Sequence, residues 1–173
     1  MSAFYRMISE NDPRWATAYA DERFDECELW DSVESLGDRS EWSELKLTAS
    51  DGDLSDMLPC DVIGRICSAR LVRVLDPFAD AVWWLPVSVA KDGVQYNYSF
   101  MHFPNVPDVL DVARTTYLAG KVARPHLSLE KTRNMPLVCL RPLTPSVVVR
   151  SDVRDTIEQS ECVGISFEEL PCS

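Results

Sequence analysis

The stretch AVWWLPVSVAKDGVQYNYSFMHF, residues 81–103, decides the fold, because it holds the most apolar hairpin of the chain. An Asp-Gly pair between two β-rich runs favours a tight turn, since glycine accepts positive φ and aspartate tolerates it. With Asp92-Gly93 as a two-residue loop, the predicted partners across the hairpin are Lys91 and Val94, Val89 and Tyr96, Val87 and Tyr98, Leu85 and Phe100, and Trp83 and His102. This register gathers the bulky β-forming side chains on one face.

A three-residue loop is the alternative, and it would set Ser88, Pro86 and Trp84 against the tyrosines. A one-residue slip turns every side chain to the other face, which is costly when one face is buried. We therefore expect the two-residue loop. Proline has no N–H to donate, so Pro86 predicts that its strand lies at an edge or carries a bulge.

Short helices are expected near 62–75 and 151–160. In the first, Ser68 is the predicted N-cap, because its hydroxyl can accept an N–H of the first turn, and Asp76-Pro77 ends the helix. Weaker patterns predict strands at 4–8, 42–47, 137–140 and 164–170, a helical turn at 54–58 and a short helix at 31–36. Residues 108–135 are mixed, with loops around the prolines and a strand or turn at 108–112.

The fold class predicted from these elements is α+β, with a mainly antiparallel sheet centred on the hairpin at about 82–103 and a few short helices packed on it. At 173 residues the chain is expected to form a single domain, 1–173. Within it, residues 1–57 are an acidic N-terminal portion that is either part of the body or an appendage, and residues 58–173 form the core.

Two segments of the chain follow the same order of elements when they are aligned with an offset of 83 residues. Ser68 then aligns with Ser151, Leu75 with Glu158 and Trp84 with Phe167. Both segments have apolar residues, a serine, a short helix, a turn and a strand. An ancient duplication and a chance likeness between common helix–turn–strand units are both open explanations.

The composition indicates a globular protein, since 46% of the residues are hydrophobic and no run is long enough to cross a membrane. The first ten residues have no signal-type apolar core, so a cytoplasmic location is expected. The six cysteines contain no Cys-x-x-Cys pair, which favours buried thiols over disulfides or a zinc site. They are Cys27, Cys60, Cys67, Cys139, Cys162 and Cys172.

The formal net charge of −11 comes from one part of the chain. Residues 21–61 hold 14 aspartates and glutamates but only Arg23, Arg39 and Lys46, whereas the acids and bases on either side balance. Phosphate contacts need a basic surface, so direct binding of nucleic acid is disfavoured and a basic partner is favoured.

Signatures of catalysis are absent from the sequence, which contains no P-loop, Gly-x-Gly-x-x-Gly, Gly-x-Ser-x-Gly or His-Glu-x-x-His. His102 is expected at the apolar end of a strand and His126 in a loop. A nucleophilic Cys60 or Cys139 paired with a histidine remains an alternative without a local signature. We expect no metal, no cofactor and no catalytic residues.

Residues 58–173, about two-thirds of the chain, resemble the bacterial immunity proteins that accompany polymorphic toxins, in the class numbered eleven. The segments that carry the resemblance are Leu58-Pro-Cys-Asp, Ile66-Cys-Ser68, Trp84-Leu-Pro-Val-Ser-Val, Tyr96, Asp111, Leu137-Val-Cys-Leu, Val148-Val-Arg-Ser151 and Gly164-Ile-Ser-Phe-Glu-Glu-Leu. The resemblance implies a non-catalytic inhibitor that binds a cognate toxin, and it implies no catalytic residues.

The first functional hypothesis is therefore an immunity-type protein that neutralises a basic toxin through an acidic surface. The residues expected to contact this partner are Asp21, Glu22, Asp25, Glu26, Glu28, Trp30, Asp31 and Trp42, with a tryptophan as apolar anchor. An ordinary solubilising surface is the alternative role for these carboxylates. The other hypotheses are an acidic nucleic-acid mimic or regulator with another basic partner, and an enzyme of unrecognised type. The sequence leaves a homo-oligomer open.

Overall fold

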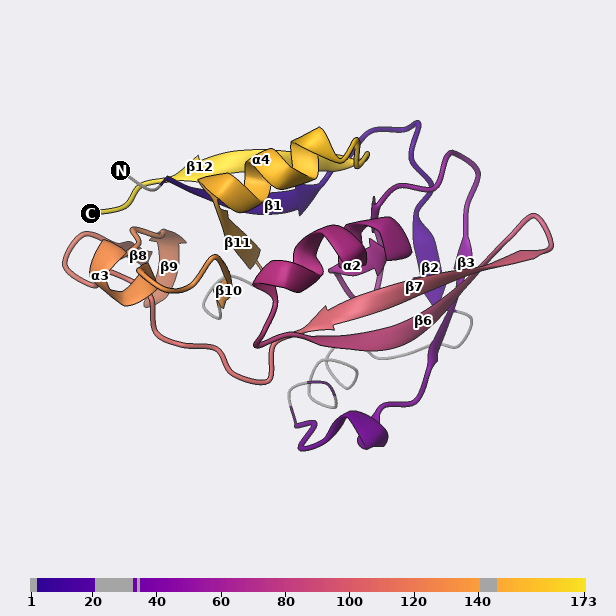
Figure 1. The fold of residues 1–173 in the computed structure, drawn as a ribbon, viewed down its shortest axis with the longest axis horizontal. Coiled ribbons are helices and arrows are strands. Elements are labelled where there is room, and N and C mark those ends of the chain that lie inside the picture. Colours follow the sequence, from indigo (N-terminus) through magenta and orange to yellow (C-terminus); the bar gives the residue numbers. More distant parts are fainter. Residues whose placement is uncertain (1–2, 21–32, 34, 141–145) are drawn as a thin grey trace.

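The structure is a computed structural model that describes residues 3–20, 33, 35–140 and 146–173 (Figure 1). A four-stranded sheet has the strand order β10-β11-β1-β12, formed by Leu137–Leu140, Ser146–Arg150, Phe4–Ser9 and Ile165–Leu170. All of its pairings are antiparallel. The strands β11 and β12 therefore run parallel to each other on the two sides of β1.

A six-stranded sheet contains the hairpin. Its order is β2-β3-β6-β7-β5-β4, formed by Ala18–Ala20, Leu45–Ala49, Trp83–Lys91, Val94–His102, Ile66–Ser68 and Met57–Leu58. Only the β3–β6 pairing is parallel. A small separate sheet pairs β8 (Thr116–Leu118) with β9 (Lys121–Arg124). The predicted α+β class with mainly antiparallel sheets is confirmed.

The predicted hairpin register is confirmed at every position. Lys91 pairs with Val94, and the ladder continues without a shift to Trp83 opposite His102. The face that carries Val87 and Phe100 is buried, as the alternation of side chains predicted. This face packs against residues of the segment 33–63 in one of the hydrophobic cores.

Pro86 does not place its strand at an edge, because β6 lies between β3 and β7. The pairing with β3 begins one residue later, where Val87 lies opposite Leu45. The missing N–H of Pro86 therefore removes no bond to β3, and the proline carbonyl instead accepts a hydrogen bond from the indole N–H of Trp42 at 2.9 Å.

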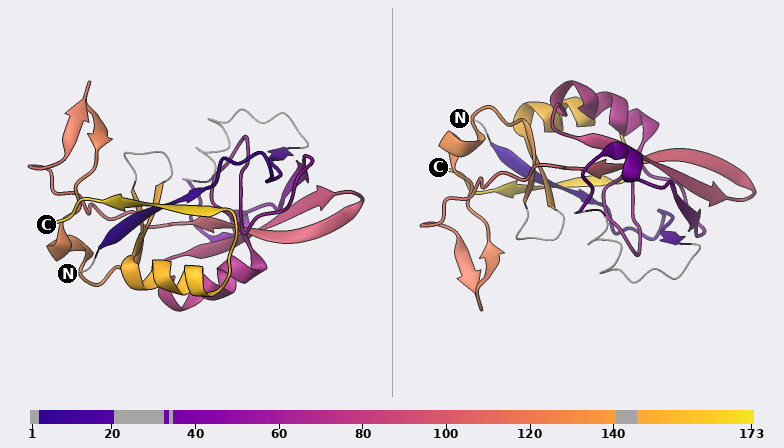
Figure 2. Two further views of the ribbon diagram at one scale, coloured as in Figure 1. Left: turned by 90° about the horizontal axis from the view of Figure 1, so that it is seen from above. Right: turned by 90° about the horizontal axis from the view of Figure 1, so that it is seen from below.

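Two helices, α2 (Ala69–Leu75) and α4 (Ser151–Gln159), lie side by side on the same side of the molecule (Figures 1 and 2). Ser68 is the N-cap of α2, as predicted, and its hydroxyl accepts the N–H of Leu71 at 3.2 Å. A third, short helix is α3 (Leu129–Thr132). The helix expected near 151–160 is confirmed.

The expectation of a helix over the whole of 62–75 is wrong for its first part. Arg65 has a φ of +64°, which no helix continues, and Ile66–Ser68 forms β5. The helical turn expected at 54–58 is also wrong, because Met57–Leu58 forms β4 and pairs with β5. Half of the helix expected at 31–36, namely residues 31, 32 and 34, lies outside the described residues.

The N-terminal part of the chain is built into both large sheets. β1 lies at the centre of the four-stranded sheet, and β3 pairs with the hairpin strand β6. One hydrophobic core joins the sheets to the helices, since it contains Met7 of β1, Met101 of β7 and Ile157 of α4. Residues 3–20 and 35–57 are therefore integral to the fold.

The two segments that align in the sequence also share one topology. In each, an edge strand is followed along the chain by a second strand, a helix and a third strand. A fourth strand, antiparallel to both neighbours, lies in the sheet between the second and the third. The first unit is β4-β5-α2-β6 with β7 inserted, and the second is β10-β11-α4-β12 with β1 inserted. The likeness therefore extends beyond one helix and one turn, because it includes the order of four strands in each sheet.

The buried carboxylate of Asp56 joins these two units. It accepts the hydroxyl of Ser68 and the backbone N–H of Val163, the latter at 2.8 Å, and Arg70 lies 3.9 Å away. The backbone N–H of Asp56 donates to the carbonyl of Val163 at 2.9 Å. The next residue, Gly164, lies so close to Ser55 that a Cβ on the glycine would be 2.3 Å from the serine Cβ.

We expect Gly164→Ala to destabilise the fold by about 3 kcal/mol, because it adds a steric overlap to the cost of a left-handed backbone. Gly93→Ala is the matched control, since its φ is +76° against +74° and nothing lies within 4 Å of the added Cβ. The control should lose only about 1 kcal/mol. Urea unfolding of both variants measures the difference, and equal losses would contradict the close packing of Gly164.

We expect Asp56→Ala to reduce the free energy of unfolding by about 3 kcal/mol, because the Ser68 hydroxyl and the Val163 N–H lose their buried acceptor. Asp53→Ala is the control, since Asp53 is an exposed carboxylate in the same segment. Its loss should stay within about 0.5 kcal/mol. Thermal or urea unfolding of the two variants makes the comparison, and similar losses would show that Asp56 does not join the two units.

Candidate functional site

Seven of the eight predicted partner-binding residues lie outside the described residues. They are Asp21, Glu22, Asp25, Glu26, Glu28, Trp30 and Asp31. The structure therefore places only Trp42 among them. Cys27 lies in the same undescribed segment.

The half-buried Trp42 has a structural role. Its indole N–H donates to the carbonyl of Pro86, and its ring stacks on that of Phe100 with the ring centres 5.8 Å apart. Since Phe100 is fully buried, this stacking holds the segment before β3 against the hairpin. Only the exposed part of the Trp42 ring remains for a partner.

The acidic segment continues into the described residues. Six of its seven described carboxylates are exposed: Asp38, Glu41, Glu44, Asp51, Asp53 and Asp61. The seventh is the buried Asp56. The first three precede β3 and the next two follow it, so they lie at opposite ends of a strand about 17 Å long. They form two acidic areas on the surface.

Ion pairing distinguishes these carboxylates from the rest of the chain. Between described residues, Asp56 is the only carboxylate of the segment that pairs with a lysine or arginine. Nine of the fourteen carboxylates outside residues 21–61 do so, from Glu10 with Arg14 to Glu168 with Arg6. Two of the exposed carboxylates accept hydrogen bonds from nearby residues of their own segment, Asp38 from the backbone N–H of Ser40 and Glu41 from that of Gly37. The exposed carboxylates of the acidic segment are therefore not held in ion pairs by the described part of the chain, although Arg39 and Lys91 attract Asp38 and Asp51 from a longer range.

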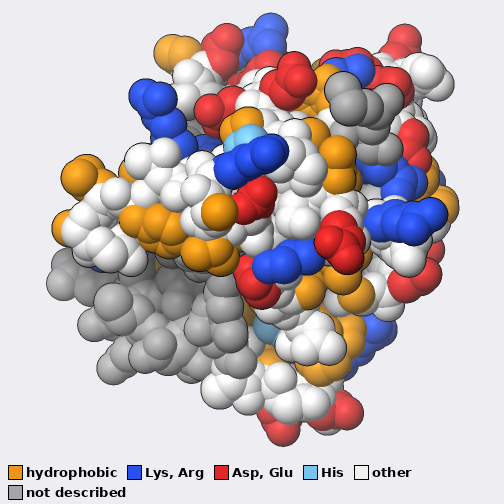
Figure 3. Space-filling model, turned by 90° about the vertical axis from the view of Figure 1, so that its left-hand side faces the viewer, with side chains coloured by type: hydrophobic (Ala, Val, Ile, Leu, Met, Phe, Trp, Pro, Cys, Tyr) orange, Lys and Arg blue, Asp and Glu red, His pale blue; other side chains and the backbone are white. Residues whose placement is uncertain are grey.

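The arm formed by β8 and β9 has the opposite character. Residues 112–126 contain no aspartate or glutamate and three cationic side chains, Arg114, Lys121 and Arg124. The arm projects from the body in Figure 2, and Leu118 near its tip is 74% exposed. Figure 3 shows hydrophobic, basic and acidic side chains mixed on this side of the molecule. The arm itself is thus basic and apolar, in contrast to the acidic residues before and after β3.

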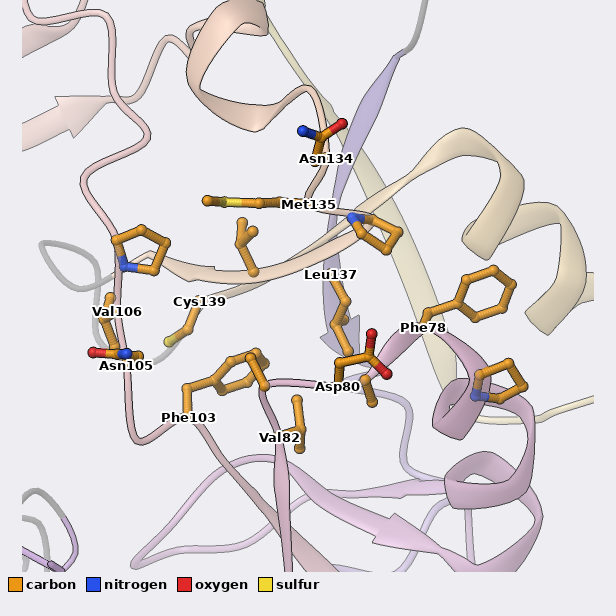
Figure 4. Close-up of a pocket in the computed structure, with 16 residues that line it drawn as sticks. Phe78, Asp80, Val82, Phe103, Asn105, Val106, Asn134, Met135, Leu137 and Cys139 are labelled. Atoms are coloured by element: carbon orange, nitrogen blue, oxygen red, sulfur yellow. The ribbon is translucent and has the colours of Figure 1, made fainter.

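A cavity of about 460 Å³ lies where the residues before β6, the residues after β7 and the strand β10 meet (Figure 4). Its walls are mainly apolar and include Phe78, Val82, Phe103, Met135 and Leu137. The polar side chains that line it are those of Asp80, Asn105 and Asn134, with the thiol of Cys139. Sequence reasoning did not find this cavity, because its residues come from three segments without a shared motif.

An enzyme with a cysteine nucleophile would need a pocket in which a histidine lies close to the thiol. Cys139 lines the cavity, but neither histidine is among the sixteen described residues around it. His126 lies on the surface, where its Nε2 is 3.1 Å from the hydroxyl of Ser173. The arrangement therefore does not place a histidine as general base for Cys139 in this cavity.

His102 is buried near Arg65, which donates to the sulfur of Cys139 at 3.5 Å. The Nε2 atom of His102 has no hydrogen-bond partner among the described residues. Burial, and secondly the positive charge of Arg65, lower the pKa of His102 below its usual value. The imidazole is therefore kept neutral in the core between Trp83 and Phe100.

The cysteines for which a pKa shift is resolved are poor nucleophiles at neutral pH. Burial raises the pKa of Cys60, Cys67 and Cys172, and it raises the pKa of Cys162 to about 11. Thiols of this kind stay protonated near pH 7.

The described part of the chain contains no group of three or more histidine, cysteine, aspartate or glutamate side chains that could hold a metal ion. None of its helices is long and apolar enough to cross a membrane.

Comparison of the chain with models of protein families and with curated proteins finds no match. The resemblance to immunity proteins thus rests on the short segments of the sequence alone.

The buried His102 predicts a pH dependence of stability. Because its pKa is lower in the folded protein than in the unfolded chain, the unfolded chain binds a proton first as the pH falls below about 6.5. Stability that is present above this pH is therefore lost as the pH falls toward the lower, folded pKa. We expect His102→Phe to reduce this loss between about pH 7.5 and about pH 5.5.

Urea midpoints at the two pH values measure the effect. His102→Gln is a second variant, since it also removes the imidazole and should reduce the pH dependence as His102→Phe does. An equal pH dependence in His102→Phe and the unmodified protein would show that His102 is not the group responsible.

Proposed function

We propose that this protein is a non-catalytic binding protein that neutralises a basic protein toxin, as immunity proteins do. The observation that carries the proposal is the set of exposed carboxylates around β3 that are not paired with cations of the described chain. Such charges create a negative potential that a basic partner can meet directly.

The physical reason is electrostatic complementarity. An acidic surface speeds the encounter with a basic one and disfavours partners of the wrong charge. Carboxylates that already pair with neighbouring arginines would have to break those pairs first. The carboxylates of Glu44, Asp51 and Asp53 have no such pairs among the described residues, so binding a cationic surface costs them little.

The class of partner follows from two further points. Toxins that attack nucleic acids need basic clefts, because phosphate contacts require lysine and arginine. The resemblance of residues 58–173 to immunity proteins also implies a toxin as the partner. An acidic regulator with a different basic partner is the second candidate, and the same carboxylates favour it.

The test is a growth-rescue assay. The product of the gene next to the one for this protein is expressed in a bacterial host with and without the protein. We expect growth to be inhibited by the neighbouring product and restored by co-expression. Failure of the unmodified protein to bind or to rescue would overturn the toxin proposal, and binding without toxicity would favour the regulator.

A charge reversal locates the binding surface. We expect the triple variant Glu44→Lys, Asp51→Lys, Asp53→Lys to weaken binding of the neighbouring product by at least about tenfold, because attraction becomes repulsion. The binding of the unmodified protein should weaken with added salt, and that of the variant should weaken less. Calorimetric titration at two salt concentrations measures both effects.

The matched control is the triple variant Glu130→Lys, Glu161→Lys, Glu169→Lys. These three exposed carboxylates lie outside the acidic segment and change the net charge by the same amount. The control should bind almost as well as the unmodified protein. If both triple variants lose the same affinity, only the total charge matters and the surface around β3 is not the binding site.

A further inference from the structure

The cavity between β6, β7 and β10 has the size and the walls of a ligand site. Its volume of about 460 Å³ lies in the range of roughly 300–1,000 Å³ that is common for small-molecule sites. Val82, Phe103, Leu137 and Cys139 in its wall are nearly inaccessible to solvent. A ligand that enters would therefore meet a mainly apolar floor formed by these residues, with exposed polar residues such as Asp80 and Asn105 also in the lining.

The charge of the cavity determines which ligands fit. The only charged side chain among the sixteen described lining residues is that of Asp80, and no lysine or arginine is among them. Figure 4 shows the Asp80 carboxylate between Leu137 and Phe78. None of the ion pairs between described residues involves this carboxylate, so it can accept a cationic group without first losing a partner.

The aromatic residues favour the same kind of ligand. Phe78 adds an aromatic ring to the cavity wall, and the negative quadrupole of such a ring attracts a cation. The ring of Phe103 already meets the guanidinium of Arg65, which lies 5.7 Å from its centre. Met135 adds a flexible side chain that adapts to the shape of an apolar group. An anionic ligand would meet the Asp80 carboxylate in a molecule whose net charge is −11.

We propose that this cavity is a binding site for a small cationic amphiphile, a molecule with an apolar ring or chain and an ammonium group. The apolar part packs between Phe103, Met135 and Leu137, and the ammonium group meets the carboxylate of Asp80. The site involves none of the carboxylates around β3, so it is independent of the proposed toxin surface.

Two probe molecules with the same apolar body and opposite charges test the proposal. Phenylbutylamine carries an ammonium group and phenylbutyrate a carboxylate. We expect the amine to bind at least about tenfold more tightly, as a charge-assisted hydrogen bond with the carboxylate predicts. The methyl NMR signal of Met135, assigned with Met135→Leu, reports binding inside the cavity during each titration.

Two variants test separately the charge of Asp80 and the free volume of the cavity. Asp80→Asn should remove most of the preference for the amine, and the variant should fold as the unmodified protein does because Asp80 is exposed. Val106→Trp should fill the cavity and weaken both probes. The controls are Glu130→Gln and Val112→Trp, which make the same changes at exposed positions away from the cavity and should not alter binding.

Three results would overturn the proposal: binding of phenylbutyrate as tight as that of the amine, no shift of the Met135 signal, or an Asp80→Asn variant with an unchanged preference. Each can be observed without the toxin. A failed growth rescue with intact amine binding would overturn the proposed function alone.

Discussion

The buried carboxylate of Asp56 is the interaction on which the arrangement of the two units depends. It accepts hydrogen bonds from the hydroxyl of Ser68, the N-cap of α2, and from the backbone N–H of Val163, in the turn before β12. Ser68 ends a strand of the six-stranded sheet, whereas β12 belongs to the four-stranded sheet. The close approach of Gly164 to Ser55 follows from the same contact, since the backbones of Asp56 and Val163 are bonded to each other. Tyr98 adds a further bond, from its hydroxyl to the carbonyl of Ser55. A buried acceptor with several donors fixes position more closely than apolar packing alone, because each unsatisfied donor would be costly.

The described surface is divided by charge. Carboxylates around β3 are exposed and mostly unpaired, whereas those elsewhere are largely neutralised by nearby arginines and lysines. The arm of β8 and β9 has positive charge and apolar side chains instead. A molecule with such a division is oriented by a charged partner before contact, so the acidic side would face a basic surface first. This is the physical basis for the proposed role as an inhibitor that binds by shape and charge.

The hairpin could be predicted from the sequence because local chemistry determines it. Asp92-Gly93 fixes the loop, and the alternation of side chains fixes the register. Ser68 and the polar segment that follows Ser151 marked their helices for the same reason. The interior position of β6 and the strand at 57–58 could not be predicted, because they depend on partners that are distant in the sequence, such as Leu45 opposite Val87. The cavity is a similar case, since Asp80, Phe103 and Leu137 meet only through the tertiary fold. The sequence predicted Trp42 as an apolar anchor for a partner but did not predict its stacking on Phe100.

The central position of β1 has a consequence for how the protein reaches its native state. Phe4–Ser9 is synthesised before the other described strands, whereas its two neighbours in the sheet, β11 and β12, are synthesised after them. The four-stranded sheet therefore cannot form until β12 has been synthesised, and until then an apolar residue of β1 such as Met7 lacks some of its partners in the core. Such distant pairing slows folding because the entropy of a long loop is lost before the contacts form. The hairpin of β6 and β7 and the neighbouring α2 depend on short-range contacts, so they can fold while synthesis continues. β1 can then pack against this part of the core before its sheet forms.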